Sequence, residues 1–296
     1  MPLGAKNLRP AAVSNGVGER ESHVDGYRLR YLQAGDGPPL VLLHGLLGYS
    51  FSWRFNIPVL SRSHTVYAPD VIGMGFSERP AQLDYSLRAC SDRVVKWIDQ
   101  LGLDSLNLVG TSHGGGMACM VAAAAAERGS PRVNRLVLVD AINHWSRGGR
   151  KRIAVLSRWL GAAVFRWTFP YTRRYHGFFL RRMYGDPAKV TQATLNGYAA
   201  GLAQPYSCDY GLGVVRTWRQ DLAQLRETYA HLRGIPTQLI WGERDPAVPL
   251  PSARELQKAL PGSELVVLPA IGHLPYEEAP EDFNRILLDF LARPVS

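Results

Sequence analysis

Short apolar runs alternate with amphipathic segments of helical length along most of this 296-residue chain, and this alternation limits the choice of fold more than any other feature. The apolar runs have the length of buried strands and cover residues 39–43, 65–71, 106–110, 135–139, 237–241 and 265–268. The helical segments cover residues 86–101, 114–128, 252–260 and 281–291. Strands separated by helices predict an α/β fold, with a mostly parallel central sheet covered by helices on both faces.

The N-terminal residues do not share this pattern. Residues 1–21 have no apolar run after Met1 and are rich in small, polar and charged residues, which predicts a mobile tail and no signal peptide. Residues 22–34 contain the two-residue turn signal Asp25-Gly26 between two strand-like stretches, so they predict a β-hairpin.

A long interruption separates the two halves of the alternating pattern. Residues 141–228 contain no clear strand but many Arg and aromatic residues at helix-like spacings, which predicts a helical cap. The core domain then comprises residues 22–140 and 229–296. The cap holds 14 Lys+Arg and four Asp+Glu, a net charge of +10, against 20 and 21 in the rest of the chain. The whole excess of positive charge therefore lies in the cap.

Three cysteines, Cys90, Cys119 and Cys208, are too few and too scattered to indicate a disulfide framework. No His/Cys cluster has the spacing of zinc ligands, so we expect no metal. No stretch is long and apolar enough to span a bilayer. Together these features predict a cytoplasmic protein and leave peripheral attachment to a membrane open.

Gly110-Thr111-Ser112-His113-Gly114 matches the pattern G-x-S-x-G. It lies between a predicted strand and a predicted helix, which is where a nucleophilic serine needs small neighbours on a sharp turn. An ordinary glycine turn with an unused serine is the alternative. The setting favours Ser112 as a nucleophile.

A serine hydroxyl needs a base within hydrogen-bond reach, and the base needs an orienting acid. His273 follows the last predicted strand and can reach the carboxyl edge of the sheet, so we expect it to be the base. Asp245 follows the strand at 237–241 and is the expected acid, because it fits the chain order Ser…Asp…His. Asp140, at the end of the strand at 135–139, is the rival acid.

The negative charge that develops during acyl transfer needs two N–H donors. The sequence predicts one from the backbone of His113, the residue after the nucleophile. It predicts the other from the backbone of Leu46, in the glycine-containing loop that begins with His44-Gly45.

From about residue 22 to 293 the chain resembles the α/β-hydrolase superfamily. The matching stretches are HGLLG at 44–48, DVIGMGFSERP at 70–80, GTSHGG at 110–115, WGERDPAVP at 241–249 and GHLPYEEAP at 272–280. The resemblance implies esterase or lipase chemistry without a metal or organic cofactor. Epoxide hydrolases and haloalkane dehalogenases are similar but use an aspartate where this chain has Ser112. Carbon–carbon bond hydrolases share the serine triad, but typically differ from this chain at Leu46, Leu47 and Leu274.

These features predict a carboxylic ester hydrolase that acts on a small-molecule ester or acyl substrate through an acyl-enzyme. A carbon–carbon hydrolase and a ligand receptor built on a hydrolase fold remain alternatives. The basic, aromatic cap has three readings: a solvated face, a lid that meets anionic lipid, or a pocket for an anionic substrate. No nucleic-acid-binding module accompanies the charge, so we expect no nucleic-acid partner. The oligomeric state is left open.

Overall fold

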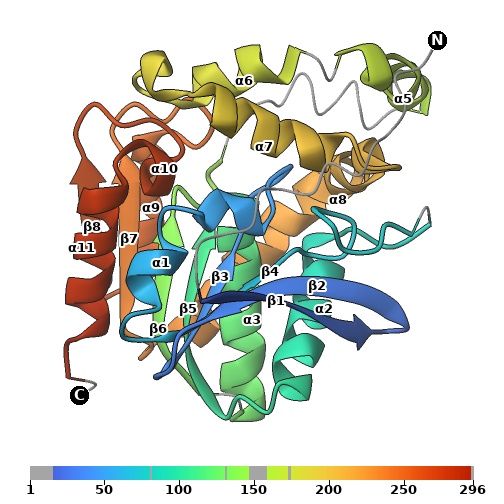
Figure 1. The fold of residues 1–296 in the computed structure, drawn as a ribbon. Coiled ribbons are helices and arrows are strands. Elements are labelled where there is room, and N and C mark those ends of the chain that lie inside the picture. Colours follow the sequence, from blue (N-terminus) through green and yellow to red (C-terminus); the bar gives the residue numbers. More distant parts are fainter. Residues whose placement is uncertain (1–15, 81, 131, 147–158, 173–174, 295–296) are drawn as a thin grey trace.

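The structure is a computed structural model that describes residues 16–80, 82–130, 132–146, 159–172 and 175–294 (Figure 1). Its centre is an eight-stranded sheet in the order β1-β2-β4-β3-β5-β6-β7-β8. The strands are β1 Val17–Val24, β2 Tyr27–Ala34, β3 Pro39–Leu43, β4 Thr65–Pro69, β5 Ser105–Thr111, β6 Arg132–Val139, β7 Thr237–Gly242 and β8 Glu264–Leu268. The pairs β1–β2 and β2–β4 are antiparallel and the others are parallel, so the predicted α/β fold is confirmed.

Helices cover both faces of the sheet. In β3, Val41 and Leu43 belong to one buried apolar cluster, and Leu40 and Leu42 belong to the other. This alternation follows from the two-residue period of a strand with both faces buried, which is why such strands read as continuous apolar runs. One face packs against α2 Leu87–Gln100, α3 His113–Arg128 and α9 Leu250–Ala259, and the other against α1 Ile57–Leu60 and α11 Pro280–Leu291.

The first strand begins earlier than the sequence predicts. Residues 17–21, expected in the mobile tail, pair with β2 as part of β1, while residues 1–15 lie outside the described residues. The prediction is wrong here because β1 is a mostly polar edge strand, held by backbone bonds rather than by an apolar pattern. The predicted hairpin turn is confirmed, since Asp25 and Gly26 have φ values of 53° and 84°, as a type I′ turn requires.

The described residues of the segment predicted as a cap form four α-helices between β6 and β7: α5 Trp159–Thr172, α6 His176–Met183, α7 Gln192–Leu202 and α8 Ser207–Thr228. Residues 147–158, also in this segment, lie outside the described residues. Figure 1 shows α5 and α6 as the outermost layer, with α7 and α8 between them and the sheet.

The boundary between cap and core is not as sharp as the predicted limits. Leu222 and Leu225, in the second half of α8, are buried in the cluster that also contains α2 and α3 side chains. Ile142 belongs to the same cluster. The core cluster therefore includes residues near both ends of the predicted cap segment, because the second half of α8 packs on the core. None of the described helices combines the length and the apolarity needed to cross a membrane.

Candidate active site

Ser112 lies at the junction between β5 and α3, in a conformation that is rare for a residue with a side chain. Its φ of 51° is positive, and the residues two positions before and after it, Gly110 and Gly114, have no room for a side chain. A Cβ on Gly110 would lie 2.2 Å from the carbonyl oxygen of Gly114, and a Cβ on Gly114 would lie 2.4 Å from that of Leu43. The G-x-S-x-G pattern is thus explained by steric demand at a strained strand-to-helix turn.

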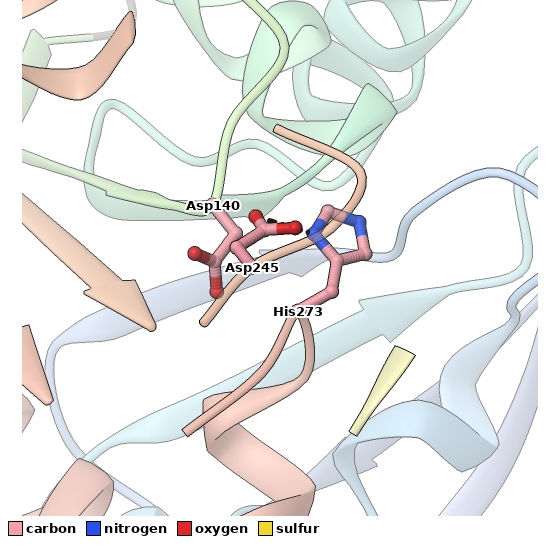
Figure 2. A group of neighbouring side chains, drawn as sticks. All are labelled: Asp140, Asp245 and His273. Atoms are coloured by element: carbon pink, nitrogen blue, oxygen red, sulfur yellow. Dashed lines mark hydrogen bonds and ion pairs between the residues drawn. The ribbon is translucent and has the colours of Figure 1, made fainter. Parts of the chain in front are cut away.

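His273 and Asp245 form a buried pair at the carboxyl edge of the sheet (Figure 2). His273 Nδ1 is 2.7 Å from Asp245 Oδ2, and both residues are buried. The other oxygen of Asp245 accepts hydrogen bonds from the backbone N–H groups of Ala247 at 2.7 Å and Val248 at 3.0 Å. These bonds hold the carboxylate in place, so that Nδ1 of His273 donates to it and Nε2 is the remaining ring nitrogen.

The rival acid, Asp140, lies beside the same pair (Figure 2). One ligand-type atom from each of Asp140, Asp245 and His273 falls within 4.8 Å of the others. Asp140 Oδ1 accepts from the Gly242 N–H at 2.9 Å, whereas Oδ2 has no hydrogen-bond partner among the described residues. Burial, together with the charge of Asp245, raises the pKa of Asp140 well above its usual range. Asp140 is therefore a buried acid that tends to keep its proton.

Asp140, Asp245 and His273 are also close enough together to be considered as ligands of a metal ion. Two carboxylates and an imidazole are common ligands, but His273 Nδ1 already donates to Asp245. Burial favours the protonated form of Asp140, and a protonated carboxyl is a poor ligand. The geometry is that of an oriented histidine rather than that of a metal centre.

The loop after β3 approaches Ser112 closely. A Cβ on Gly45 would lie 3.1 Å from the Cβ of Ser112, so the backbone of this loop runs against the serine turn. Leu46 follows directly and is half-buried. His113 is the first residue of α3, and the N–H of a first helical residue has no partner within its helix. The two backbone donors predicted from the sequence thus belong to segments that adjoin Ser112.

The rings of His44 and His113 are buried and serve structure. His44 Nδ1 donates to the Gly45 carbonyl at 2.9 Å, and its Nε2 accepts from the Val71 N–H at 3.0 Å. His113 Nδ1 is 3.3 Å from the Tyr210 hydroxyl. Burial lowers the pKa of both rings, to about 3 for His113, so both are neutral at physiological pH. The ring of His44 ties the loop to the end of β4.

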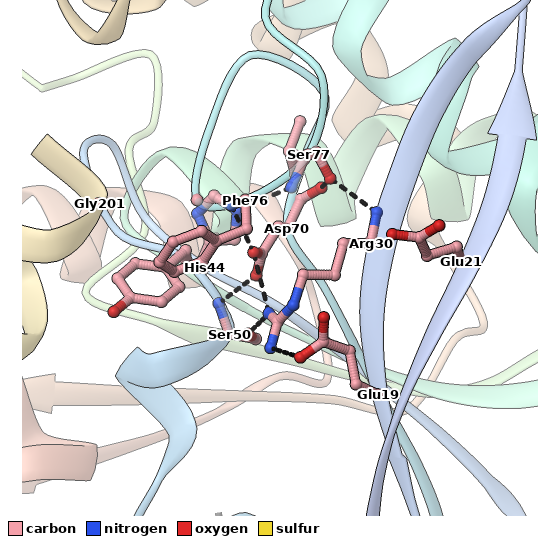
Figure 3. A network of polar contacts seen from close by, with 12 residues as sticks. Glu19, Glu21, Arg30, His44, Ser50, Asp70, Phe76, Ser77 and Gly201 are labelled. Atoms are coloured by element: carbon pink, nitrogen blue, oxygen red, sulfur yellow. Dashed lines mark hydrogen bonds and ion pairs between the residues drawn. The ribbon is translucent and has the colours of Figure 1, made fainter. Parts of the chain in front are cut away.

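A second network supports this loop and was not predicted from the sequence (Figure 3). The buried carboxylate of Asp70 accepts from the Ser50 N–H and from the Phe76 N–H, each at 2.8 Å, and from the Arg30 guanidinium at 3.0 Å. Arg30 also donates to Glu19 at 2.9 Å. Asp70 lies in the DVIGMGFSERP stretch, whose likeness to the family was the only signal that could have indicated this role.

The cap is attached to the loop that carries His273. The His273 N–H donates to the Met183 carbonyl at 2.6 Å, at the end of α6. In α10 Pro275–Glu278, Glu277 accepts from Tyr184 Oη at 2.6 Å and pairs with Arg54 at 2.9 Å. Glu278 accepts from the N–H groups of Gly185 and Gly272 at 2.9 Å and 2.8 Å. Sequence reasoning missed both glutamates, because nothing local distinguishes a buried glutamate from an exposed one.

Comparison with known proteins agrees with this architecture. The family model described as the alpha/beta hydrolase fold matches residues 38–280. Haloalkane dehalogenase 2 of Mycobacterium tuberculosis is 31% identical over 272 residues, which cover 88% of this chain and 91% of that protein. The 2-hydroxymuconate semialdehyde hydrolase of Pseudomonas sp. (strain CF600) is 29% identical over 289 residues, with coverage of 92% and 93%. A solved meta-cleavage product hydrolase from Pseudomonas fluorescens IP01 has a TM-score of 0.74 at 27% identity, covering 92% of this chain and 97% of that one.

A mostly parallel sheet with a serine on a strained turn and an acid–histidine pair at its carboxyl edge defines a hydrolase of the α/β class. The chain belongs to the α/β-hydrolase fold family.

Proposed function

We propose that the chain is a serine hydrolase that cleaves a carboxylic ester, with Ser112 as nucleophile, His273 as base and Asp245 as the acid that orients the base. The observation that carries the proposal is the buried hydrogen bond between His273 Nδ1 and Asp245 Oδ2, at the sheet edge where the strained Ser112 turn also lies. Further support comes from the backbone N–H groups that hold Asp245 on its other side.

The reaction follows from these roles. His273 Nε2 takes the proton of Ser112 as the serine oxygen attacks the ester carbonyl. The backbone N–H groups of His113 and Leu46 stabilise the oxyanion, and His273 passes the proton to the leaving alcohol. Water, deprotonated by the same ring, then releases the acid from the acyl-enzyme. Asp245 stabilises the imidazolium that forms in both halves of the reaction.

A carbon–carbon bond hydrolase is the second candidate. The observation that favours it is the likeness to 2-hydroxymuconate semialdehyde hydrolase over nearly the full length of both chains. Such enzymes resemble this chain in their serine triad, whereas the leucines at 46, 47 and 274 depart from their usual pattern. The likeness to haloalkane dehalogenase 2 adds no candidate, since that class typically uses an aspartate where this chain has Ser112.

The test is a substrate panel measured with the native chain and with Ser112→Ala. Nitrophenyl esters from acetate to long chain should be cleaved with turnover, and release of nitrophenol should show a burst if the acyl-enzyme accumulates. Ring-cleavage dienones, which absorb in the visible, should be consumed slowly. The opposite order of rates would make the chain a carbon–carbon hydrolase. Failure to turn over either class, with measurable binding, would indicate a ligand receptor.

A further inference from the structure

The outer layer of the cap exposes an unusual number of large apolar side chains. Of the twelve such side chains that are exposed among the described residues, eight lie between residues 159 and 179. Six of these are aromatic, and we call them the aromatic surface: Trp159, Trp167, Tyr171, Tyr175, Phe178 and Phe179. Large apolar side chains that gather on successive exposed helices, rather than occurring singly, indicate contact with another apolar phase or partner.

The helix α5 is apolar on nearly all its sides, yet it lies on the outside of the molecule (Figure 1). Its single charged residue, Arg166, forms an ion pair with Asp209 of α8. Among the α5 side chains that the structure describes, only Ala162 is buried. A helix with this composition is normally covered on every side. Here the side that faces away from α8 has no cover within the described chain.

The sequence segment that carries the aromatic surface has charge of one sign. From Ala141 to Gly185 the sequence contains ten Lys+Arg and no Asp or Glu. Arg181 and Arg182 of α6 are exposed beside this surface, and the Arg182 guanidinium lies 5.6 Å from the centre of the Phe178 ring. The other basic residues of this stretch, apart from Arg166, lie outside the described residues.

The charge and the residue types of the aromatic surface together indicate what kind of partner covers it. Trp and Tyr favour the boundary between lipid headgroups and acyl chains, and nearby Arg or Lys bind anionic headgroups. A second copy of the chain docked on this surface would bring Arg181 and Arg182 toward the same residues of its partner, and the sequence from 141 to 185 contains no acidic residue to balance them. An anionic bilayer satisfies both the apolar rings and the arginines.

We propose that α5 and α6 dock on the surface of an anionic phospholipid bilayer, with the aromatic surface at the headgroup–acyl boundary and the arginines among the headgroups. The helices α7 and α8 lie between this layer and the sheet, so the core stays outside the lipid (Figure 1). This docking does not depend on the hydrolytic reaction.

The experiment is flotation of the full chain with vesicles, using Ser112→Ala so that no lipid is hydrolysed. Vesicles of phosphatidylcholine mixed with phosphatidylglycerol should carry the protein, and vesicles of phosphatidylcholine alone should carry much less. Binding should fall between 0.1 M and 1 M salt, because the Debye length shrinks from about 10 Å to about 3 Å. Tryptophan emission should shift to shorter wavelength on binding, since Trp159 and Trp167 leave water.

Two double variants and two controls locate the surface. Arg181→Glu with Arg182→Glu should weaken binding at least about tenfold, given roughly 1 kcal/mol for each cation near an anionic leaflet. Phe178→Gln with Phe179→Gln should weaken binding to a similar extent, because binding at the interface depends on the apolar area that is buried there. Val267→Gln on β8 and Arg285→Glu on α11 change one exposed apolar and one exposed basic residue away from the cap, and should leave binding unchanged.

Three results would overturn the proposal. The first is that the protein ignores anionic vesicles at low salt, and the second is equal binding to both lipid compositions. The third is that the parent chain is a dimer in analytical ultracentrifugation whereas the Phe178→Gln, Phe179→Gln variant is a monomer, because a second copy would then cover the aromatic surface. Ester hydrolysis by the native chain is measured separately, so each proposal can fail without the other.

Discussion

The core and the cap use apolar residues in opposite ways. In the core, Leu40 and Leu42 are 0% exposed, because helices cover both faces of the sheet. In the outer layer of the cap, Trp159 and Trp167 are 82% and 74% exposed. Both regions are rich in apolar residues in the sequence. The difference teaches that composition indicates which segments need cover, whereas the position of a segment in the fold determines whether the chain itself supplies that cover.

Polar groups differ between the two regions as well. At the carboxyl edge of the core, buried groups such as Asp70 and Asp245 accept several hydrogen bonds from fixed backbone donors. The cap is joined to that edge by a few contacts, among them those of Glu277 and Glu278. We therefore expect substitutions at the core edge to affect chemistry, those at the joint to affect stability, and those on the outer cap to affect neither.

The largest expected effect tests whether the chemistry belongs to the core. Ser112→Ala should lower kcat for a nitrophenyl ester by roughly 10⁴- to 10⁶-fold and leave the circular dichroism spectrum unchanged, because only the nucleophile is removed. A fluorophosphonate probe should label the native chain and not the variant. Ser63→Ala, an exposed control, should behave as the native chain. Equal labelling of the Ser112 variant would place the nucleophile elsewhere.

The next effect separates the two neighbouring acids. Asp245→Asn should lower kcat by roughly 10⁴-fold, because an amide favours the wrong tautomer of His273. Asp140→Asn should cost about tenfold or less, because burial raises the pKa of Asp140 and so favours its neutral form, which asparagine resembles. Both values should be measured at one pH on folded proteins. A larger loss in the Asp140 variant would make Asp140 the orienting acid.

Substitutions where the cap contacts the core should have a smaller effect, and this effect should be on folding stability rather than on catalysis. Glu277→Gln leaves the Arg54 guanidinium without its ion-pair partner in a buried setting, and should lower the free energy of unfolding by about 3 kcal/mol. Urea unfolding measures this change. Glu255→Gln removes an exposed pair with Lys258 and should cost less than about 1 kcal/mol. Equal losses in the two variants would mean that the joint contributes no more than a surface pair.

The smallest effect is a pH dependence of folding stability, and it arises at Asp221, where α8 contacts the core helix α2. Asp221 accepts from the Leu87 N–H at 3.2 Å and from Thr217 Oγ1 at 2.7 Å, and burial raises its pKa to about 6. An unfolded aspartate titrates near about 3.9, so between roughly pH 4 and 6 the folded chain holds a proton that the unfolded chain has lost. Folding stability should therefore fall as the pH rises through this window.

Asp221→Asn removes the carboxyl group that titrates, and so tests whether stability falls or rises with pH. The Tm of the variant minus the Tm of the native chain should increase from pH 4 to pH 7, as measured by calorimetry. Asp289→Asn, an exposed control on α11, should show a constant difference. A difference that shrinks with rising pH would mean that Asp221 is ionised in the folded chain throughout.

The sequence predicted the strands and helices of the core to within a few residues because both faces of a parallel sheet are buried. Such strands read as uninterrupted apolar runs, as at residues 39–43, where prediction and structure coincide. The first part of β1, residues 17–21, was not predicted, since a polar edge strand has no such signal. The second half of α8 was assigned to the cap, because an amphipathic pattern does not indicate which neighbour its apolar side meets.

The sequence by itself determined the α/β architecture and the positions of Ser112, Asp245 and His273, because each lies where a strand ends and local residues dictate that turn. Only the tertiary structure decided what surrounds them. Arg30 and Asp70 are 40 residues apart, and Arg54 and Glu277 are 223 residues apart, yet each pair forms an ion pair that is largely shielded from solvent. The tertiary structure likewise placed Asp140 beside Asp245. The physical reason is that burial and the nearness of a charge set the state of a carboxyl group, and both depend on segments that meet only in the folded chain.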